Sequence, residues 1–488
     1  MNPTDKPYIE KDLSFSQDRI YHVLLYATFI GSILIYFWSI WAIPTLSHNE
    51  ARRMIVVQEM LTRHNWLIPT INNEIYIEKP PLFYWLAIPF VLLFRSTAEW
   101  VIRLPSALSA FALTWLLFFH VRRYFDRWSA LFSALLLTTS FYFSESARVA
   151  ELPMVLTACC CCALLFYFDC LQNNEKKRYL YLAYIFMGLA FLTKGPVSLI
   201  FILCPILVFG FFPKNRHAIK GLIFLPGWTV FILIAFPWYL YVIFSLGKGP
   251  LEGVIQRDIF HKIVGTSDSA PFYQYILVLI GSFSPWVLVL FHRTKSQFKR
   301  LFTERDTAYF AFSFTVPMII MSLFSARESN YIVPVLPVTA VFIGIWVKDY
   351  FNHIYKAGRH KLFRRLAWGI VLFMAFPFLY YAMVQPRIKK YKFEAFQPII
   401  SKIHEAPQDT PVYSYKQLYY QLIYYYGQPI PNIDMQKINN MISARKSFLL
   451  IVQDRYWGQL NGLDFRVLIE YRPFINKHRS VRMLAFPG

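Results

Sequence analysis

Residues 47–81 read SHNEARRMIVVQEMLTRHNWLIPTINNEIYIEKPP, and this polar stretch lies between long apolar runs. Its apolar positions predict a short amphipathic helix from about residue 50 to about residue 63. Acidic and basic side chains beside a membrane are costly unless they are paired or used, so the stretch predicts a functional loop. The polar side chains at its two ends are Asn49, Glu50, Arg52, Glu78 and Lys79.

The rest of the chain is strongly apolar: 56% of its 488 residues are hydrophobic and 19% are aromatic. Many apolar runs reach 18 residues or more, which predicts an α-helical polytopic membrane protein with about 11–13 transmembrane helices. The run 81–94 is short for a span, so we expect it to lie in the interface or to re-enter it. The expected spans are about 20–44, 103–121, 128–145, 152–171, 178–193, 196–212, 220–244, 272–291, 307–325, 330–347 and 366–385.

The formal net charge is +22, but the cations lie mostly in short loops between apolar runs. This distribution suits topology signals and contacts with anionic lipid better than a nucleic-acid groove, so no nucleic-acid partner is expected. The positive-inside rule places the N-terminus in the cytoplasm and the C-terminus outside. The basic loops counted as cytoplasmic are 121–127, 172–178, 213–220, 292–300 and 348–365. The six cysteines lie in apolar runs and show neither metal-ligand spacing nor a disulfide framework.

From about residue 388 the pattern changes to short strand-like runs that alternate with a helix-like stretch. This predicts a membrane domain over 1–387, with an outer catalytic loop at 45–102, and a small soluble α/β domain over 388–488 on the outer face. Tyrosines crowd the run 413–426 of that domain. They could stack on sugar faces, or they could form the core of the domain.

On this topology the unusual polar residues gather at the outer face. Lys79 is followed by two prolines, and Lys194 is followed by Gly195 and Pro196, so both cations are held by a stiff backbone. Rigid cations at a membrane surface suit a phosphate attached to a lipid. The simpler interpretation is that loop residues are polar without further role, with Arg148 and Glu151 a local pair. The outer-face set also includes Asp258, Lys262, Arg327, Glu328 and Tyr331.

A series of motifs runs through the chain in a fixed order. They are NEAR (49–52), Trp66–Pro69, EKPPLFYW (78–85), RLPSAL (103–108), ELPM (151–154), LTKGP (192–196), PWYLYV (237–242) and YIVPVLP (331–337). The series resembles the aminoarabinose transferase and protein O-mannosyltransferase superfamily of GT-C membrane glycosyltransferases, and the aminoarabinose branch more closely. The resemblance covers about residues 20–345.

The resemblance implies transfer of a sugar from a polyprenyl (undecaprenyl) phosphate to an acceptor at the outer face of a bacterial inner membrane. In that reaction, cations stabilise the leaving phosphate. By match to the motifs, the residues expected to bind the carrier phosphate are Arg52, Lys79, Lys194, Lys262 and Tyr331. The catalytic positions expected beside the acceptor are Asn49, Glu50 and Glu151, and Glu78 is expected at a divalent-metal site if the enzyme uses one.

Three positions depart from the family pattern. Asn49 stands where the family has an aspartate. In the loop 257–263, which reads RDIFHKI, Ile259 stands at the expected histidine position. Glu151 lies one residue before the position of the family's second acid. Asparagine cannot be a general base, so either the acceptor is already an oxyanion, such as a lipid A phosphate, or the protein only binds lipid-linked sugar. The rival functions are a protein O-glycosyltransferase and a lipid transporter. We expect a monomer, because the fold encloses its own site.

Overall fold

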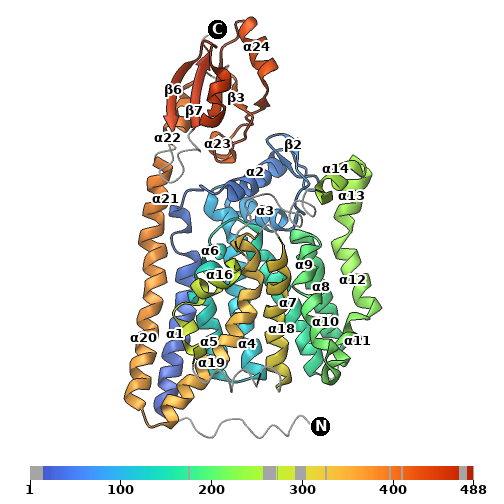
Figure 1. Ribbon diagram of the computed structural model, residues 1–488, viewed down its shortest axis with the longest axis vertical. Coiled ribbons are helices and arrows are strands. Elements are labelled where there is room, and N and C mark those ends of the chain that lie inside the picture. Colours follow the sequence, from blue (N-terminus) through green and yellow to red (C-terminus); the bar gives the residue numbers. More distant parts are fainter. Residues whose placement is uncertain are drawn as a thin grey trace. The chain divides into compact units, whose positions relative to one another are not determined.

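The computed structural model describes residues 15–173, 176–256, 271, 273–291, 300, 304–324, 327–394, 397–407, 410–471 and 481–486. The chain divides into two compact units. Unit 1 is helical, and unit 2 combines helices with β-strands (Figure 1). Unit 1 contains Met1–Ile40, Ile77–Pro89 and Arg103–Ala382, and unit 2 contains Trp41–Tyr76, Phe90–Ile102 and Met383–Gly488.

The helices of unit 1 follow the apolar runs of the sequence. They are α1 (Phe15–Phe37), α5 (Arg127–Thr139), α6 (Phe141–Ala147), α7 (Leu152–Gln172), α8 (Lys177–Lys194), α9 (Val197–Ile200), α10 (Leu203–Phe211), α11 (His217–Leu222), α12 (Leu225–Ala235), α13 (Pro237–Leu246), α14 (Gly249–Ile255), α16 (Gln274–Phe283), α18 (Arg305–Leu323), α19 (Leu336–Lys356) and α20 (His360–Leu379). Helices α3 (Leu82–Phe94) and α4 (Glu99–Tyr124) contribute most of their length to unit 1.

Close helix pairs form the core of unit 1. Helix α7 packs along α8, α5 packs along α19, and α1 lies beside α20 (Figure 1). At Gly344 of α19, an added Cβ would stand 2.6 Å from the hydroxyl oxygen of Ser133 and 2.9 Å from its backbone nitrogen in α5. Glycine therefore allows α5 and α19 to approach more closely than any larger residue would.

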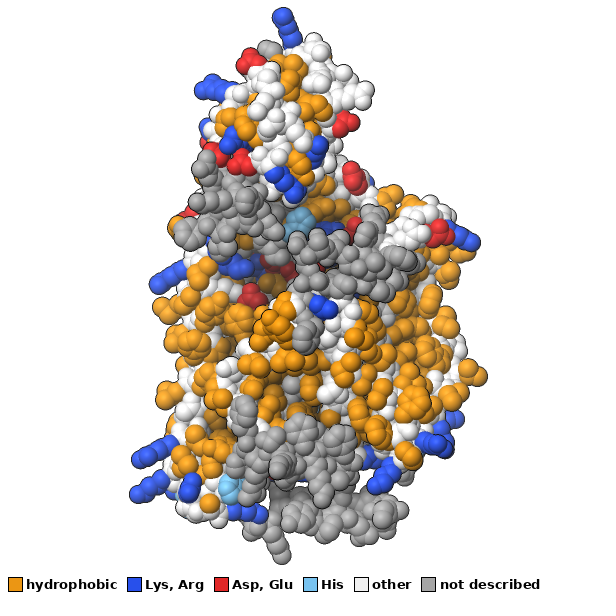
Figure 2. Space-filling model, viewed as in Figure 1, with side chains coloured by type: hydrophobic (Ala, Val, Ile, Leu, Met, Phe, Trp, Pro, Cys, Tyr) orange, Lys and Arg blue, Asp and Glu red, His pale blue; other side chains and the backbone are white. Residues whose placement is uncertain are grey.

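Six helical segments of the described residues are long and apolar enough to cross a membrane, or seven if the bent pair α12 and α13 forms one span. The expectation of eleven or more spans counted apolar runs, and several of these runs fold as shorter helices. The run at 128–145 is divided between α5 and α6, and the run at 196–212 between α9 and α10. Figure 2 shows hydrophobic side chains covering most of the visible face of unit 1, as expected for a surface in contact with lipid.

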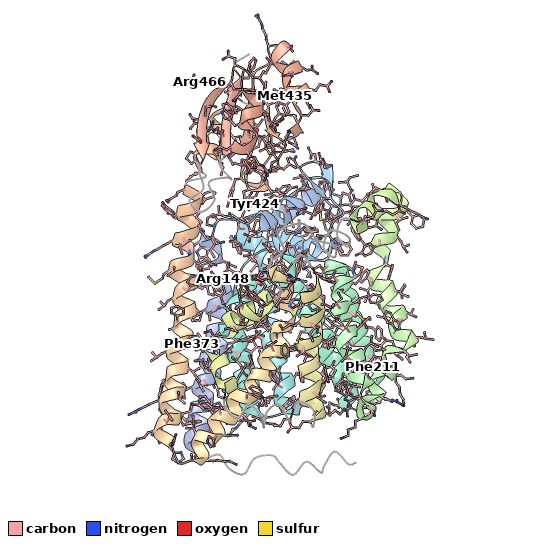
Figure 3. All side chains as sticks on the ribbon, viewed as in Figure 1. Arg148, Phe211, Phe373, Tyr424, Met435 and Arg466 are labelled. Carbon is pink, nitrogen blue, oxygen red and sulfur yellow. The ribbon has the colours of Figure 1, made fainter. Side chains whose placement is uncertain are left out.

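Two guanidinium groups are buried inside unit 1. Arg103 donates a hydrogen bond to the carbonyl oxygen of Ile40 at 2.7 Å. Arg148, labelled in Figure 3, donates to the carbonyl oxygens of Ile35 at 2.6 Å and Trp38 at 2.8 Å. Burial lowers the pKa of Arg148 to about 10, so the group still carries its charge at neutral pH. The two arginines donate to carbonyl oxygens around the end of α1, where the supply of intrahelical donors ends.

The predicted amphipathic helix of the first loop is confirmed as α2 (His48–Thr62) in unit 2. It begins two residues earlier than expected because Ser47 caps it, accepting a hydrogen bond from the backbone N–H of Glu50 at 3.3 Å. Its core face is fully covered, with Met54, Val56 and Val57 all at 0% exposure. The helix is therefore an integral part of unit 2.

A small hairpin follows α2. Strands β1 (Thr70–Ile71) and β2 (Glu74–Ile75) pair antiparallel through Asn72 and Asn73, whose φ angles are +56° and +67°. Asparagine tolerates this left-handed region better than most residues. The Asn72 side chain exchanges two hydrogen bonds with the backbone of Ile430, donating at 3.0 Å and accepting at 2.7 Å. The hairpin is thereby fastened to the C-terminal segment of the same unit.

A five-stranded mixed sheet lies at the centre of the C-terminal segment, in the order β4-β3-β5-β7-β6. Strand β3 is parallel to β4 and β5, whereas β7 is antiparallel to β5 and β6. The strands are β3 (Val412–Tyr415), β4 (Asn432–Ile433), β5 (Phe448–Gln453), β6 (Arg466–Tyr471) and β7 (Val481–Phe486), and the main helices are α21 (Gln385–Glu394), α22 (Gln397–Glu405), α23 (Tyr420–Tyr426) and α24 (Met435–Ser443). The predicted fold class, a helical membrane protein with a small α/β domain, is confirmed.

Candidate active site

A cavity of about 250 Å³ lies in unit 1 where several chain segments meet. The segment before α3, the turn after α8, helices α13, α14 and α18, and the 3₁₀ helix η5 (Ser329–Val335) all line it. The polar and aromatic residues among its lining are Glu78, Lys79, Lys194, Trp238, Tyr239 and Tyr331. The remaining walls are mostly aliphatic, including Val197, Ile200, Leu251 and Val254. A cavity of this kind suits a ligand with an anionic group and an apolar tail.

Lys79 enters this cavity from a stretch of chain that cannot be helical. Pro80 and Pro81 follow it, and α3 starts at Leu82. A proline disfavours helical backbone in the residue before it, so Lys79 stays outside the helix. The backbone N–H of Trp85 donates to the carbonyl oxygen of Pro81 at 3.0 Å, which makes the prolines the entry to α3. The EKPP motif thus fixes a half-buried cation at the cavity wall.

Lys194 is the last residue of α8 and reaches the same cavity. Its ammonium nitrogen lies 4.3 Å from the centroid of the Tyr331 ring, which is 8% exposed. A cation this close to an aromatic face is attracted by the ring's quadrupole, and more so when it is partly desolvated. Tyr331 therefore holds the ammonium in place and, through η5, ties it to the start of α19 (Leu336–Lys356).

Gly195 makes the turn that ends α8 possible. Its φ is +68° and its ψ is −151°, a combination that is open almost only to glycine. Its N–H donates to the carbonyl oxygen of Phe191 at 2.7 Å, and its own carbonyl oxygen accepts from the Ser198 hydroxyl at 2.7 Å. A Cβ here would stand 3.3 Å from the Tyr239 hydroxyl oxygen. The glycine thus lets α13 approach the end of α8 beside the cavity.

Glu78 is the carboxylate among the described lining residues, and it stands with the ammonium groups of Lys79 and Lys194. Divalent cations such as Mg²⁺ prefer several oxygen ligands. Among the residues that the structure describes, no group of three or more His, Cys, Asp or Glu side chains is arranged to hold a metal. Glu78 alone does not complete such a site, and the metal role given to it by the motif stays a prediction.

Asn49 and Glu50 belong to the first turn of α2 in unit 2. Asn49 is exposed, whereas Glu50 is 3% exposed and accepts a hydrogen bond from the Thr45 hydroxyl at 2.5 Å. A carboxylate near a helix N-terminus is also favoured by the helix dipole. The structure therefore gives Glu50 a clear role in the start of α2, and its catalytic role stays a prediction.

Arg52 lies between two tyrosine rings within unit 2. Its guanidinium carbon is 4.9 Å from the ring centroid of Tyr76 and 5.4 Å from that of Tyr420 on α23. The Tyr420 ring also packs on His48, with 4.6 Å between centroids. The tyrosine-rich run thus contacts the first loop. Tyr415, at 2% exposure, is in the core of the sheet, as the structural interpretation of that run expected.

Tyr425 provides a further link inside unit 2. Its hydroxyl accepts from the backbone N–H of Thr45 at 2.8 Å and donates to a carboxylate oxygen of Glu99 at 2.9 Å. Burial, and next the neighbouring Glu99 carboxylate, raise the pKa of Tyr425, so its proton is retained. The hydroxyl therefore fixes α23 to the chain on both sides of the predicted catalytic loop.

The remaining predicted residues lie elsewhere. Glu151 precedes α7, is half-buried, and is not among the described residues that line the cavity. Lys262 and Asp258 lie outside the described residues. Arg327 donates from Nε to the carbonyl oxygen of Ser322 at 3.0 Å. The structure thus brings together Glu78, Lys79, Lys194 and Tyr331, while Asn49, Glu50 and Arg52 belong to the other unit.

Trp238 and Tyr239 are aromatic cavity residues that were not predicted as site residues. Trp238, 3% exposed, and Tyr239 line the cavity from α13. Both belong to the motif PWYLYV (237–242), which the sequence comparison with the family had already singled out. The two adjacent aromatic residues could have suggested a site, because Trp and Tyr are common where a binding surface is apolar at one end and polar at the other.

Comparisons with known proteins agree with this fold. The model of the dolichyl-phosphate-mannose-protein mannosyltransferase family matches residues 78–241, which include Lys79, Lys194 and Trp238. An uncharacterized protein of Aquifex aeolicus is 26% identical over 452 residues, or 90% of this chain and 97% of that protein. The undecaprenyl phosphate-alpha-4-amino-4-deoxy-L-arabinose arabinosyl transferase 1 of Pseudomonas fluorescens is 26% identical over 349 residues, or 68% of this chain. The match spans 59% of that transferase.

The fold is also that of solved membrane proteins. ArnT from Cupriavidus metallidurans, solved with bound undecaprenyl phosphate, has a TM-score of 0.79 at 17% identity, covering 97% of this chain and 98% of ArnT. The oligosaccharyltransferase AglB from Archaeoglobus fulgidus has a TM-score of 0.56 at 11% identity, covering 91% and 70%. These likenesses define a multi-span membrane protein with a GT-C fold. The chain is thus similar, over residues 78–241 and in its fold, to the GT-C membrane glycosyltransferases that include the aminoarabinose transferases and the protein mannosyltransferases.

Proposed function

We propose that this protein transfers a sugar from a polyprenyl phosphate, such as undecaprenyl phosphate, to lipid A or a related envelope glycolipid. The observation that carries the proposal is that Lys79 and Lys194 line one largely apolar cavity. Two ammonium groups in such a place suit the phosphate of a lipid carrier whose chain continues into the apolar part. The names of the arabinosyl transferase relatives and the undecaprenyl phosphate in ArnT support the same donor class.

The chemistry follows from the leaving group. An acceptor oxygen attacks the anomeric carbon, the bond from that carbon to the phosphate oxygen breaks, and the phosphate leaves with the electron pair. Charge develops on that oxygen, and the cations of Lys79 and Lys194 stabilise it most in the transition state. From the motifs of the sequence alone, Arg52 and Lys262 are also proposed to bind a carrier phosphate. Tyr331 acts through Lys194, which it holds by its ring face.

The acceptor is proposed to be an oxyanion. Asn49 cannot take a proton, and Glu50 is already engaged by the Thr45 hydroxyl at 2.5 Å. An acceptor phosphate, such as that of lipid A, attacks without being deprotonated, so it needs no general base. This favours a glycolipid phosphate over a neutral sugar or protein hydroxyl. Catalytic roles for Asn49 and Glu151 are then limited to positioning the acceptor.

We further propose that the protein acts as a monomer in a bacterial inner membrane, with the cavity toward the periplasm. The basic loops of the sequence support this orientation, because Lys and Arg accumulate on the cytoplasmic side. A divalent cation at Glu78 stays a prediction from the family motif.

A protein O-glycosyltransferase is the second candidate, because the family model that matches the cavity residues is described as a protein mannosyltransferase. It would use the same donor site and differ in the acceptor. A third candidate is a protein that only binds or moves lipid-linked sugar, which the replacement of an aspartate by Asn49 suggests.

The test compares lipid A from a strain that lacks the gene with lipid A from the same strain complemented by wild type, Lys79→Ala or Lys248→Ala. Lys248 precedes α14, is exposed, and does not line the cavity, so it is a matched control for loss of one lysine. Mass spectrometry should show lipid A that carries an added sugar-sized mass when the strain has wild type or Lys248→Ala. The amount of this modified lipid A should fall roughly 100-fold with Lys79→Ala.

The result also separates the candidates. An unchanged lipid A profile together with a lost glycoprotein would favour the protein acceptor. No change in any glycoconjugate, with carrier binding intact, would favour the non-catalytic candidate. Equal activity of Lys79→Ala and Lys248→Ala would remove the cavity from the mechanism.

A further inference from the structure

A second cavity, of about 130 Å³, lies in unit 1 among α7, α8, α11 and the residue before α12. Its lining includes three basic side chains, Lys177, His217 and Lys220. Lys177 is the first residue of α8, whereas Lys194 of the candidate active site is the last. The two cavities therefore lie at opposite ends of one helix.

The length of α8 relates both cavities to the membrane. The helix has 18 residues. At a rise of 1.5 Å per residue it is about 26 Å long. The hydrocarbon core of a bilayer is about 30 Å thick. An α8 that crosses the bilayer along its normal therefore places the two cavities near opposite surfaces, where lipid headgroups are.

The walls of the second cavity are held tightly. The Tyr167 hydroxyl of α7 donates to the carbonyl oxygen of Ala218 in α11. Gly221 packs so close to this ring that an added Cβ would stand 2.8 Å from the Tyr167 Cζ. The Gly221 carbonyl oxygen accepts from the Tyr184 hydroxyl of α8 at 3.0 Å. The basic side chains thus stand on a frame fixed by three helices, as a binding site requires.

More positive charge lies at the edge of this cavity. Arg305, the first residue of α18, is within hydrogen-bond distance of the His217 ring and donates to the carbonyl oxygen of Leu171 at 3.4 Å. The carboxylate of the next residue, Asp306, accepts a hydrogen bond from the Gln172 side chain. The balance of described charge around the cavity is positive, which favours an anionic ligand.

Exposed apolar side chains lie on the chain segments next to the basic ones. Phe211, labelled in Figure 3, is 75% exposed, and Ile223 and Leu225 are 68% and 74% exposed. All three lie on the segments that flank α11. Figure 2 shows Lys and Arg side chains at the margin of the hydrophobic face of unit 1. A basic cavity bordered by exposed apolar side chains matches the two halves of a phospholipid.

We propose that this cavity binds the headgroup phosphate of an anionic phospholipid. Lys177 and Lys220 pair with the phosphate, and the acyl chains of the lipid lie along Phe211, Ile223 and Leu225. The phosphate oxygens accept hydrogen bonds from the two ammonium groups, and no covalent step is involved. This site is separate from the sugar-transfer cavity, and the proposal does not depend on the proposed function.

The experiment uses the full chain in detergent, stripped of lipid and titrated with phosphatidylglycerol or phosphatidylcholine, with bound lipid counted by native mass spectrometry. Wild type should bind one phosphatidylglycerol roughly tenfold or more tightly than phosphatidylcholine. The double variant Lys177→Ala/Lys220→Ala should lose roughly 10- to 30-fold of that affinity. The control Lys176→Ala/Lys214→Ala removes two exposed lysines from the neighbouring loops, which do not line the cavity, and should bind like wild type.

The proposal is overturned if both double variants bind phosphatidylglycerol equally, because general surface charge would then explain the binding. It is also overturned if wild type does not distinguish the two lipids, or if inorganic phosphate displaces the lipid at equal concentration. If a variant fails to fold, the wild-type protein still tests the site. In wild type alone, added salt should weaken phosphatidylglycerol binding and leave phosphatidylcholine binding unchanged, and equal responses would count against the site.

Discussion

The ammonium nitrogen of Lys194 lies 4.3 Å from the centroid of the Tyr331 ring, although 136 residues separate the two in the sequence. The contact joins the end of α8 to η5 at the wall of one cavity. Two features of the chain make it possible. Gly195 ends the helix directly after the lysine, and the prolines of YIVPVLP (331–337) prevent a regular helix from starting before Leu336.

The first prediction concerns this contact. Tyr331→Phe keeps the ring and should retain transfer activity within about threefold, because the attraction comes from the ring face. Tyr331→Leu removes the quadrupole and should lower kcat/KM by about tenfold, which is close to 1.4 kcal/mol. Steady-state kinetics with a polyprenyl-phosphate sugar provide the measurement. Equal losses in the two variants would mean that the hydroxyl, and not the ring, matters.

The second prediction concerns Gly195. Its φ of +68° with a ψ of −151° is strained for any other residue. Gly195→Ala should therefore lower stability by about 1–3 kcal/mol and disturb the position of Lys194. Gly249→Ala is the matched control, because a Cβ there meets nothing within 4 Å and no positive φ is recorded. Thermal unfolding in detergent should separate them, and equal melting temperatures would contradict the argument.

The third prediction concerns Arg148, whose side chain is 1% exposed and donates to carbonyls near the end of α1. Arg148→Ala leaves those carbonyls buried without this donor and should cost about 3 kcal/mol of stability. Arg148→Lys keeps the charge but cannot span both acceptors, so it should recover only part of the loss. The exposed Arg365→Ala on α20 serves as control. Thermal melts of the three variants test the order, and full recovery by lysine would show that charge alone is sufficient.

The fourth prediction concerns the acceptor. If the acceptor is an oxyanion, Glu50→Gln should retain activity within about threefold, because an amide oxygen can still accept from Thr45. If Glu50 is a general base, the same change should remove about 100-fold or more in kcat. Glu59→Gln is the control on the same helix, since Glu59 accepts from the Thr70 hydroxyl at 2.5 Å. A loss confined to Glu50→Gln would reject the oxyanion acceptor.

The sequence was sufficient to predict the local features of this protein. The amphipathic helix α2, the helix after EKPP and the apolar runs all follow from periodicity and proline positions, and the structure has them. The cations Lys79 and Lys194 were predicted because prolines and a glycine fix the backbone beside them. The stiffness of a chain segment depends on adjacent residues, so it can be predicted without knowledge of the fold.

Contacts between residues that are far apart in the chain could not be predicted from the sequence. Nothing in the residues around Arg52 indicates that Tyr420 will pack on it, because the contact depends on how α2 and α23 meet. The lengths of the helices were also missed in places. The run at 196–212 is as apolar as a span, but it breaks between α9 and α10. Apolar composition alone does not record where a helix ends inside a membrane.

Unit 2 is assembled from three pieces of chain, with Trp41–Tyr76 and Met383–Gly488 separated by about 300 residues. This order has a consequence for synthesis. Ile430 lies 358 residues after Asn72. Ribosomes add roughly 5–20 residues per second, so the first loop waits about 18–72 seconds before its partner Ile430 is made. During that time the amide of Asn72 has no Ile430 backbone to bind. A chaperone would have this interval to act on the first loop, and a ribosome that stalls before residue 383 would leave α2 without α23.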